Sequence, residues 1–259
     1  MPHVKVNDIN MYYRVVGDGF PLVAIMGLAG NSDWWPRGFV EQLGRHYQVI
    51  LFDNRGAGRT DAPESEYSIP MMARDTAGLM AALGIKKAHV MGLSMGGMIA
   101  QEIALLFPEA VDQLVLGCTN CGPLHSIPPT AETLQTLAES ITSPEKTLDL
   151  VFPPRFVAEN PEKVQEFVSR IAIAPMPPGP FQRQIGAVAA FDSFERLPEI
   201  TAQTLVLTGD LDVLIPPENS QIIARHIPNA ELITIPGAGH LFIDQYPEQV
   251  LEILLNFLR

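Results

Sequence analysis

The chain has 259 residues, of which 47% are hydrophobic, and this is enough to bury the core of one sizeable domain. Acidic residues outnumber basic ones by 29 to 17, and the formal net charge of -12 predicts repulsion from nucleic acid and from anionic membranes. The N-terminus lacks the basic start and apolar run of a secretion signal, and no apolar stretch approaches the ~20 residues of a membrane span. We therefore expect a cytoplasmic protein whose partner is neither nucleic acid nor a membrane.

The first elements are expected to form an antiparallel β-hairpin. Residues 4–8 and 10–17 alternate in polarity and are joined by a polar Asn-Asp turn. Further along the chain, short continuous apolar runs replace the alternation, which predicts strands covered on both faces and thus a mainly parallel, doubly wound α/β sheet. These runs are residues 22–26, 48–52, 88–92, 114–118, 204–209 and 231–235.

Helical patterns lie between the runs. Residues 68–84 carry apolar side chains at three- and four-residue spacing and begin with Ser68, a good N-cap. Residues 217–228 and 246–259 have the same pattern. We expect these helices to cover the two faces of the sheet.

One interval is much longer than a single crossover helix requires. It is rich in proline and holds two helical patterns, at residues 129–140 and 160–174. Ligands in open α/β sheets bind at the carboxyl ends of the strands. We expect residues 122–198 to form a helical cap over those ends, while residues 1–121 and 199–259 form the core.

A candidate nucleophile follows the run at 88–92. The segment Gly92-Leu93-Ser94-Met95-Gly96 joins this strand directly to an apolar helical pattern and fits Gly-x-Ser-x-Gly. Such a sharp turn strains the backbone of the Ser, needs small neighbours and lifts the hydroxyl above the sheet. The helix N-terminus then directs its free amides and positive dipole to the same point. Ser94 is therefore the expected nucleophile.

The two cysteines, Cys118 and Cys121, have the spacing of a redox pair. Such pairs usually lie at a helix N-terminus, whereas Cys118 ends an apolar run and Pro123 follows in a loop. Zinc would need about four ligands, and no second Cys/His pair of suitable spacing is nearby. We expect neither redox chemistry, nor a metal, nor another cofactor.

A base and an acid are expected at two further strand ends. His240 follows the last apolar run in a loop that Gly237 and Gly239 allow to fold tightly, and it is the expected base. Asp210 and Asp212 both follow the run at 204–209, and only one of them can orient the imidazole. A surface or packing role is expected for the other histidines, which are His3, His46, His89, His125 and His226.

Together these segments resemble the α/β-hydrolase superfamily over nearly the whole chain except the cap. Similar to the family are Gly92-Leu93-Ser94-Met95-Gly96-Gly97, the turn Phe52-Asp53-Asn54-Arg55-Gly56-Ala57-Gly58-Arg59-Thr60, Gly209-Asp210-Leu211-Asp212 and Gly237-Ala238-Gly239-His240. The resemblance implies the α/β-hydrolase fold and agrees with the chain order Ser, acid, His. In relatives that read Gly-Asp-x-Asp before a nearby Pro the second Asp is generally the triad acid, which implies Asp212. Asp210 and Asp53 then hold their turns.

The resemblance also implies an oxyanion hole. One donor is the amide of Met95, the residue after the nucleophile. The second is expected from the loop Met26-Gly27-Leu28-Ala29-Gly30, at the amide of Leu28. Relatives commonly have His-Gly-x-x-Gly here, so Met26 takes the place of a side chain that often braces the loop.

The resulting hypothesis is a serine hydrolase, of carboxylesterase type, that cleaves carboxylic esters or lactones of small to medium apolar acyl groups through an acyl-enzyme. Ser94 argues against haloalkane dehalogenases and epoxide hydrolases, which use an Asp nucleophile. A thioesterase, a carbon–carbon bond hydrolase, a cofactor-free perhydrolase and a non-catalytic small-ligand receptor stay open as alternatives. Coenzyme A thioesters are expected to be poor substrates, because the loops expected at the site supply no Lys or Arg. These loops supply Met26, Leu28, Trp34, Trp35, Met95, Leu214 and Leu241.

Overall fold

The protein is built on one eight-stranded sheet, seen in a computed structural model that describes residues 2–140 and 145–259. The strand order is β1-β2-β4-β3-β5-β6-β7-β8. The pairs β1–β2 and β2–β4 are antiparallel and all other pairs are parallel, so the predicted fold class is confirmed. The strands are β1 (His3–Val6), β2 (Ile9–Val16), β3 (Phe20–Ile25), β4 (Tyr47–Phe52), β5 (Ala88–Leu93), β6 (Val111–Gly117), β7 (Gln203–Gly209) and β8 (Ala230–Ile235).

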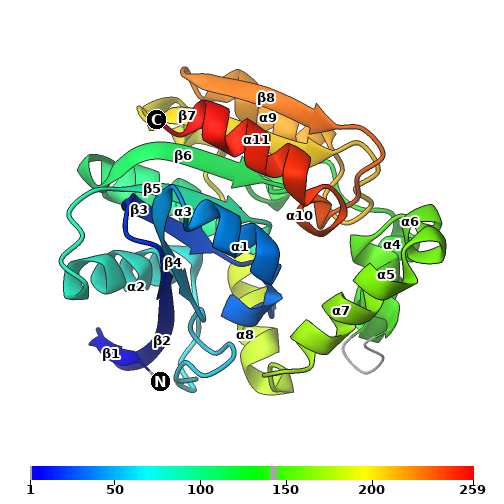
Figure 1. The fold of residues 1–259 in the computed structure, drawn as a ribbon, viewed down its shortest axis with the longest axis horizontal. Coiled ribbons are helices and arrows are strands. Elements are labelled where there is room, and N and C mark those ends of the chain that lie inside the picture. Colours follow the sequence, from blue (N-terminus) through cyan, green and yellow to red (C-terminus); the bar gives the residue numbers. More distant parts are fainter. Residues whose placement is uncertain (1, 141–144) are drawn as a thin grey trace.

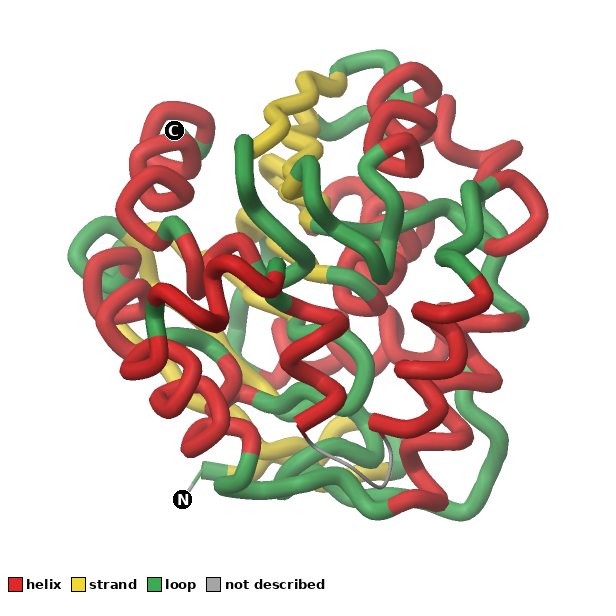
Figure 2. Tube along the Cα trace, turned by 90° about the vertical axis from the view of Figure 1, so that its right-hand side faces the viewer, coloured by secondary structure: helices red, strands yellow, loops and turns green. Residues whose placement is uncertain are grey.

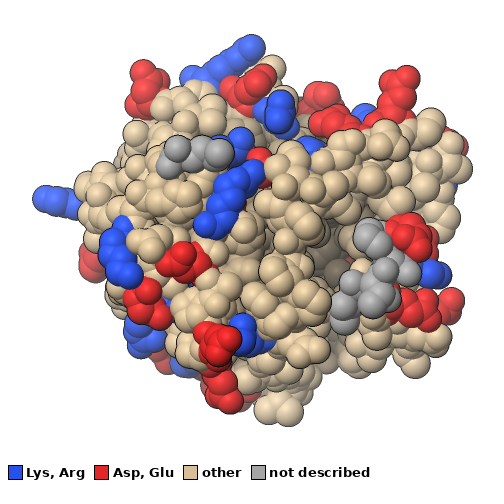
Figure 3. All heavy atoms as spheres, turned by 90° about the horizontal axis from the view of Figure 1, so that it is seen from below, with Lys and Arg blue, Asp and Glu red and all other residues tan. Residues whose placement is uncertain are grey.

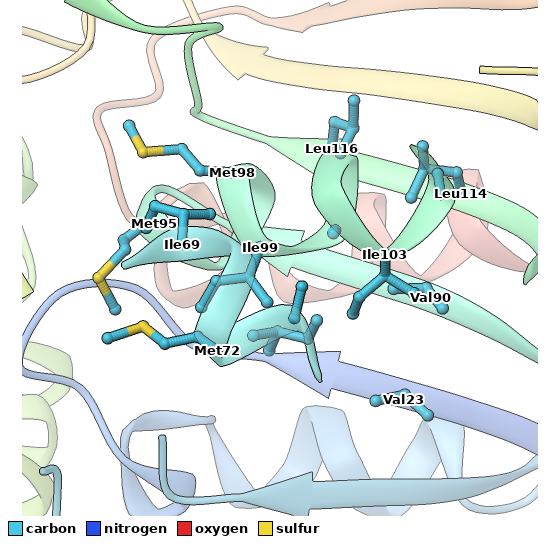
Figure 4. Close-up of a cluster of buried hydrophobic side chains, with 14 of the residues drawn as sticks. Val23, Ile69, Met72, Val90, Met95, Met98, Ile99, Ile103, Leu114 and Leu116 are labelled. Atoms are coloured by element: carbon cyan, nitrogen blue, oxygen red, sulfur yellow. The ribbon is translucent and has the colours of Figure 1, made fainter. Parts of the chain in front are cut away.

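Helices cover both faces of the sheet because its strands bury successive residues on opposite sides. Val23 and Ile25 of β3 join one buried cluster, and Leu22 and Ala24 join the other. The first cluster includes α2 (Ile69–Ala82), α3 (Met95–Leu106) and α9 (Glu218–His226), and Figure 4 shows apolar side chains of α2 and α3 beside those of the strands. The second includes α1 (Arg37–Leu43), α10 (Phe242–Gln245) and α11 (Pro247–Phe257). No helix in the described part of the chain is long and apolar enough to cross a membrane.

The segment between β6 and β7 forms a separate group of helices. Its longer helices are α4 (Ala131–Ser140), α5 (Glu145–Val151), α6 (Pro154–Glu159), α7 (Pro161–Ile171) and α8 (Pro178–Ala189). Figure 1 shows α4 to α7 on the side toward which the strand arrows of β6 and β8 point, and this side faces the viewer in Figure 2. We call residues 122–198 the insertion. Four of its residues, 141–144, and residue 1 of the predicted core lie outside the described residues.

Prolines begin helices in the insertion. Pro154, Pro161 and Pro178 are the first residues of α6, α7 and α8, where the missing amide hydrogen costs no hydrogen bond. The helical patterns at 129–140 and 160–174 contain α4 and α7. The helices α5, α6 and α8 were not expected from the sequence.

The insertion leaves and rejoins the core at adjacent points. The Ser193 amide donates to the Cys121 carbonyl at 2.9 Å, and the Ser193 hydroxyl donates to Oε1 of Gln101 at 2.7 Å. Nε2 of the same Gln101, on α3, donates to the Asn120 carbonyl at 3.0 Å. These bonds, which we call the clasp, hold both ends of the insertion on α3.

Candidate active site

Ser94 lies in the tight turn between β5 and α3. Its φ of 56° and ψ of -123° are unusual for a residue with a side chain and store local strain. The turn is closed by glycines: a Cβ at Gly92 would overlap the Gly96 carbonyl, and a Cβ at Gly96 would overlap the Ile25 carbonyl. Ser94 stays partly exposed although its neighbours are buried. This is the geometry that the motif predicted.

His240 and Asp212 are brought together from different strand ends. Nδ1 of His240 lies 2.8 Å from Oδ2 of Asp212, and both side chains are buried. The other oxygen, Oδ1, accepts the amides of Leu214 and Ile215 at 2.9 Å each. Because both oxygens are held, the carboxylate keeps one orientation, and its contact with Nδ1 leaves Nε2 of the ring as the free nitrogen.

Asp210, the other carboxylate of the same loop, does not contact the imidazole in this way. Its side chain is exposed and accepts the Gly237 amide at 2.6 Å, which ties the loop after β7 to the loop after β8. Asp53 likewise accepts two backbone amides, from Ser32 at 2.7 Å and Arg59 at 2.8 Å. Both residues therefore hold turns.

Cys118 connects the Ser94 turn to the Asp212–His240 pair. Its sulfur lies beside the Ser94 backbone, and potential ligand atoms of Cys118, Asp212 and His240 lie within 4.8 Å of one another. Burial, together with the Asp212 carboxylate, raises the pKa of the Cys118 thiol well above its usual range. Potential ligands to an ion are thus present in these three groups, and the raised pKa keeps the Cys118 thiol neutral beside the pair.

Cys121 lies away from this group. It belongs to the first buried cluster, whereas Cys118 belongs to the second, and both cysteines are free. The Cys121 sulfur lies 3.9 Å from the Ser126 hydroxyl. The spacing of the two cysteines therefore produces no disulfide.

The loop after β3 packs directly against Ser94. A Cβ at Gly27 would come within 2.9 Å of the Ser94 Cβ, and the Gly30 amide donates to the Gly27 carbonyl at 3.2 Å. Among the described residues, the Leu28 amide has no hydrogen-bond acceptor. Met95 is the first residue of α3, so its amide has no acceptor within the helix. The two amides expected to bind an oxyanion are thus both available beside the Ser94 turn.

The apolar residues expected at the site divide into two sets. Trp34, Leu214 and Leu241 belong to a third apolar cluster, in which side chains of α4 to α7 meet the loops of the core. Met26, Trp35 and Met95 are instead buried in the two clusters of the sheet, and Leu28 is half-buried against the first of these clusters. The backbone of Met95 therefore contributes to the site while its side chain packs in the core.

Two contacts join the insertion to the histidine loop. The Leu241 amide donates to the Val151 carbonyl at 3.1 Å. A Cβ at Gly239 would come within 2.8 Å of Cδ of Pro153, so the turn between α5 and α6 lies directly against this loop. The insertion thus supports the segment that carries His240.

Arg170 of α7 is a buried charge that was not expected from the sequence. Its guanidinium donates to the Trp34 carbonyl and to Asp244 of α10. Both side chains are largely buried, and the ion pair anchors α7 to the helix that follows His240. A basic residue within a polar helical pattern gives no sign of such a partner.

The remaining histidines have packing or surface roles. His125, which begins the insertion, is exposed and stacks on Phe194 with a ring distance of 4.0 Å. His89 is buried in β5 between Phe20 and Tyr47, and burial lowers its pKa. Neither contacts the Asp212–His240 pair.

Known proteins resemble the chain over its full length. The sequence profile of the alpha/beta hydrolase fold family matches residues 21–247. The protein named "Putative carbamate hydrolase RutD" of Azorhizobium caulinodans is 32% identical, over 99% of this chain and 98% of its own. The solved structure of Est816, an N-acyl homoserine lactone degrading enzyme, is 29% identical with a TM-score of 0.88, over 99% of this chain and 100% of its own. The solved structure of a thermophilic esterase from Thermogutta terrifontis is 27% identical with a TM-score of 0.85, over 100% of this chain and 98% of its own.

Proposed function

The chain belongs to the α/β-hydrolase family and is a hydrolase of this fold, and on that premise we propose that it is a serine hydrolase. Its proposed substrates are carboxylic esters or lactones of small to medium apolar acyl groups. The observation that carries the proposal is the 2.8 Å contact between Asp212 and His240, on strand ends that also carry the strained Ser94. Three groups of these types from three separated segments match the requirements of acyl transfer.

The proposed reaction proceeds through an acyl-enzyme. His240 takes the Ser94 proton while Oγ attacks the carbonyl carbon, and Asp212 holds the imidazole and stabilises its cation. The amides of Leu28 and Met95 donate to the oxyanion, a role for which both are unpaired within the described chain. His240 then protonates the leaving alcohol. Water, activated by His240, releases the acid and regenerates Ser94.

The insertion is the proposed cap that limits acyl chain length. Its third apolar cluster contains Leu241, next to His240, and Leu214, whose amide holds Asp212. An apolar acyl group is bound by removing area from water, at about 25 cal/mol per Å². Figure 3 shows a hollow, and the described residues along its border are largely other than Lys, Arg, Asp and Glu; this hollow is the proposed entrance. Arg170, a buried cation of the insertion, is paired with Asp244 and is therefore not free to bind a phosphate-bearing carrier.

Two measurements test this function. A fluorophosphonate should label the wild-type protein at one site, which peptide mapping should place at Ser94, and Ser94→Ala should abolish the labelling. Turnover is then compared across p-nitrophenyl esters of short to long acyl chains, lactones and acyl-coenzyme A. Short or medium esters should be preferred. Absence of labelling would favour a receptor, and efficient hydrolysis of acyl-coenzyme A or of very long chains would contradict the proposed substrate range.

Carbamates are a second candidate substrate class, supported by the similarity to RutD over nearly the whole chain. The same nucleophile would attack the carbamate carbonyl and form a carbamoyl-enzyme. An unsubstituted aryl carbamate and the matched acetate ester, compared at equal concentration, separate the two classes. A higher kcat/KM for the carbamate would make it the preferred substrate.

A further inference from the structure

We propose that Gln184 of α8 is a positioning residue for the oxyanion loop, residues 26–30, and that the insertion therefore helps to build the catalytic machinery. The inference rests on the proposed function. It names a residue that neither the motifs nor the Asp212–His240 pair include.

The amide group of Gln184 connects the oxyanion loop to the turn after β4. Its Oε1 accepts the Ala29 amide at 3.0 Å, and its Nε2 donates to the Arg55 carbonyl at 3.0 Å. The side chain is fully buried. Because both ends of the amide are engaged and water is excluded, the group has one satisfied orientation.

The end of this connection at Arg55 is rigid. The Arg55 side chain is buried and forms ion pairs with Asp75 at 2.7 Å and Asp8 at 2.6 Å. A Cβ at Gly56, the next residue, would come within 2.9 Å of Cβ of Pro180, so α8 lies directly on this turn. Gln184 therefore holds Ala29 in a fixed position relative to a rigid turn of the core.

The end at Ala29 requires support. Ala29 has a φ of 61°, in the left-handed region that residues with a Cβ seldom adopt. Within the loop the Met26 carbonyl accepts Nδ2 of Asn54 at 2.8 Å, and the Gly27 carbonyl accepts the Gly30 amide. Gln184 accepts the Ala29 amide, while the Leu28 amide has no acceptor among the described residues. The Gly30 bond holds the peptide between Gly27 and Leu28, which carries the Leu28 N–H, and the Gln184 bond holds the next peptide, between Leu28 and Ala29. Because the peptides on both sides of Leu28 are held, its backbone rotation is restricted, and with it the direction of its N–H.

The experiment compares Gln184→Met with Gln101→Met. Methionine keeps the length of the side chain and removes both hydrogen bonds. Gln101 is the matched control, since it is equally buried and also engaged at both ends, but within the clasp. For both variants we measure kcat and KM for the best ester, the Ki of phenylboronic acid as a mimic of the tetrahedral intermediate, the Tm, and amide exchange at Ala29 by NMR.

We expect Gln184→Met to lower kcat about 10- to 100-fold and to raise the phenylboronic acid Ki by a similar factor, because a displaced donor weakens transition-state binding. KM should change less than about twofold, since the ground-state contacts are retained. Ala29 exchange should accelerate. Gln101→Met should lower the Tm comparably but leave kcat, Ki and Ala29 exchange near the wild-type values. Gln184→Glu, which keeps an acceptor for Ala29, should retain most of kcat.

Three results would overturn the inference. Unchanged Ala29 exchange in Gln184→Met would show that the bond does not hold the loop. Unchanged kcat and Ki would show that the bond is irrelevant to catalysis. Equal losses of kcat in Gln184→Met and Gln101→Met would show that both losses come from a general loss of stability and not from the oxyanion loop. Failure of the wild type to turn over any ester would instead contradict the proposed function, while Ala29 exchange would still report on the bond.

Discussion

The Ser94 turn and the insertion differ most in how completely they are packed. In α3, which begins after Ser94, 10 of the 12 residues are buried, whereas in α7 of the insertion only 2 of 11 are. A Cβ at Gly96 would overlap backbone, while a Cβ at Gly186 of α8 would meet nothing within 4 Å. A closely packed turn can hold strain at the reacting group, and a loosely packed segment can change its residues freely. This contrast agrees with the proposed division of the molecule into a part that carries the chemistry and a part that selects substrates, and Gln184 is hydrogen-bonded between the two.

The largest effect is expected at the nucleophile. Ser94→Ala should lower kcat by about 10⁶, the order found when a triad nucleophile is removed. The fold should persist, because the methyl group fits wherever the hydroxymethyl did. Circular dichroism and ester turnover measure the two effects. Near wild-type hydrolysis by this variant would remove Ser94 from the mechanism.

The next largest effect is expected at the acid. Asp212→Asn should lower kcat by about 10⁴, because the amide would no longer select the correct imidazole tautomer. Asp210→Asn is the matched change on the same loop. It should act mainly on Tm, since the Asp210 side chain accepts the Gly237 amide and so ties two loops together. Kinetics and melting curves of both variants show which of the two aspartates acts in the triad, and the reverse pattern would assign this role to Asp210.

Packing of the Ser94 turn is tested by Gly96→Ala. The added Cβ would overlap the Ile25 carbonyl, so β3 and α3 would have to separate. We expect a loss of about 3 kcal/mol in the free energy of unfolding, measured by urea denaturation, from this overpacking. Activity should fall as well, because the same shift moves Met95. A variant as stable as the wild type would show that the turn is looser than described.

The smallest effect is expected from the same substitution in the insertion. Gly186→Ala should stabilise the protein by up to about 1 kcal/mol, because Gly186 is inside α8 and a Cβ there is unobstructed. Ester turnover should stay within about twofold, since the position lies on the open side of the helix. The free energy of unfolding of Gly186→Ala and of Gly96→Ala, measured by urea denaturation under the same conditions, completes the comparison. Destabilisation by Gly186→Ala would mean that the insertion is packed as closely as the core.

The positions of the strand ends, and the candidate catalytic residues that follow them, could be predicted from the sequence for a physical reason. Buried parallel strands appear as continuous apolar runs, and their carboxyl ends converge on one edge, so Ser94, Asp212 and His240 were expected to be neighbours. The structure confirms the sheet and brings Asp212 and His240 together, while their catalytic roles stay predictions.

The structure of the insertion was harder to predict from the sequence. The prolines at 177, 178 and 180 concealed α8, because a proline is compatible with the first turn of a helix but is a poor predictor of one. Gln184 was missed with that helix. Arg170 was missed because its partners, Trp34 and Asp244, are distant in the chain. Tertiary contacts of this kind leave no periodic pattern.

The clasp has an evolutionary consequence. Since Cys121 and Ser193 are hydrogen-bonded to each other, the chain between them is a loop whose ends already meet. The entropic cost of closing such a loop grows only with the logarithm of its length. Recombination could therefore exchange the whole segment for a shorter or longer one without moving a strand. An incoming segment would have to replace the contacts by which the insertion supports the core, which include the acceptor for the Ala29 amide, the Val151 carbonyl that accepts the Leu241 amide, and the Arg170–Asp244 ion pair.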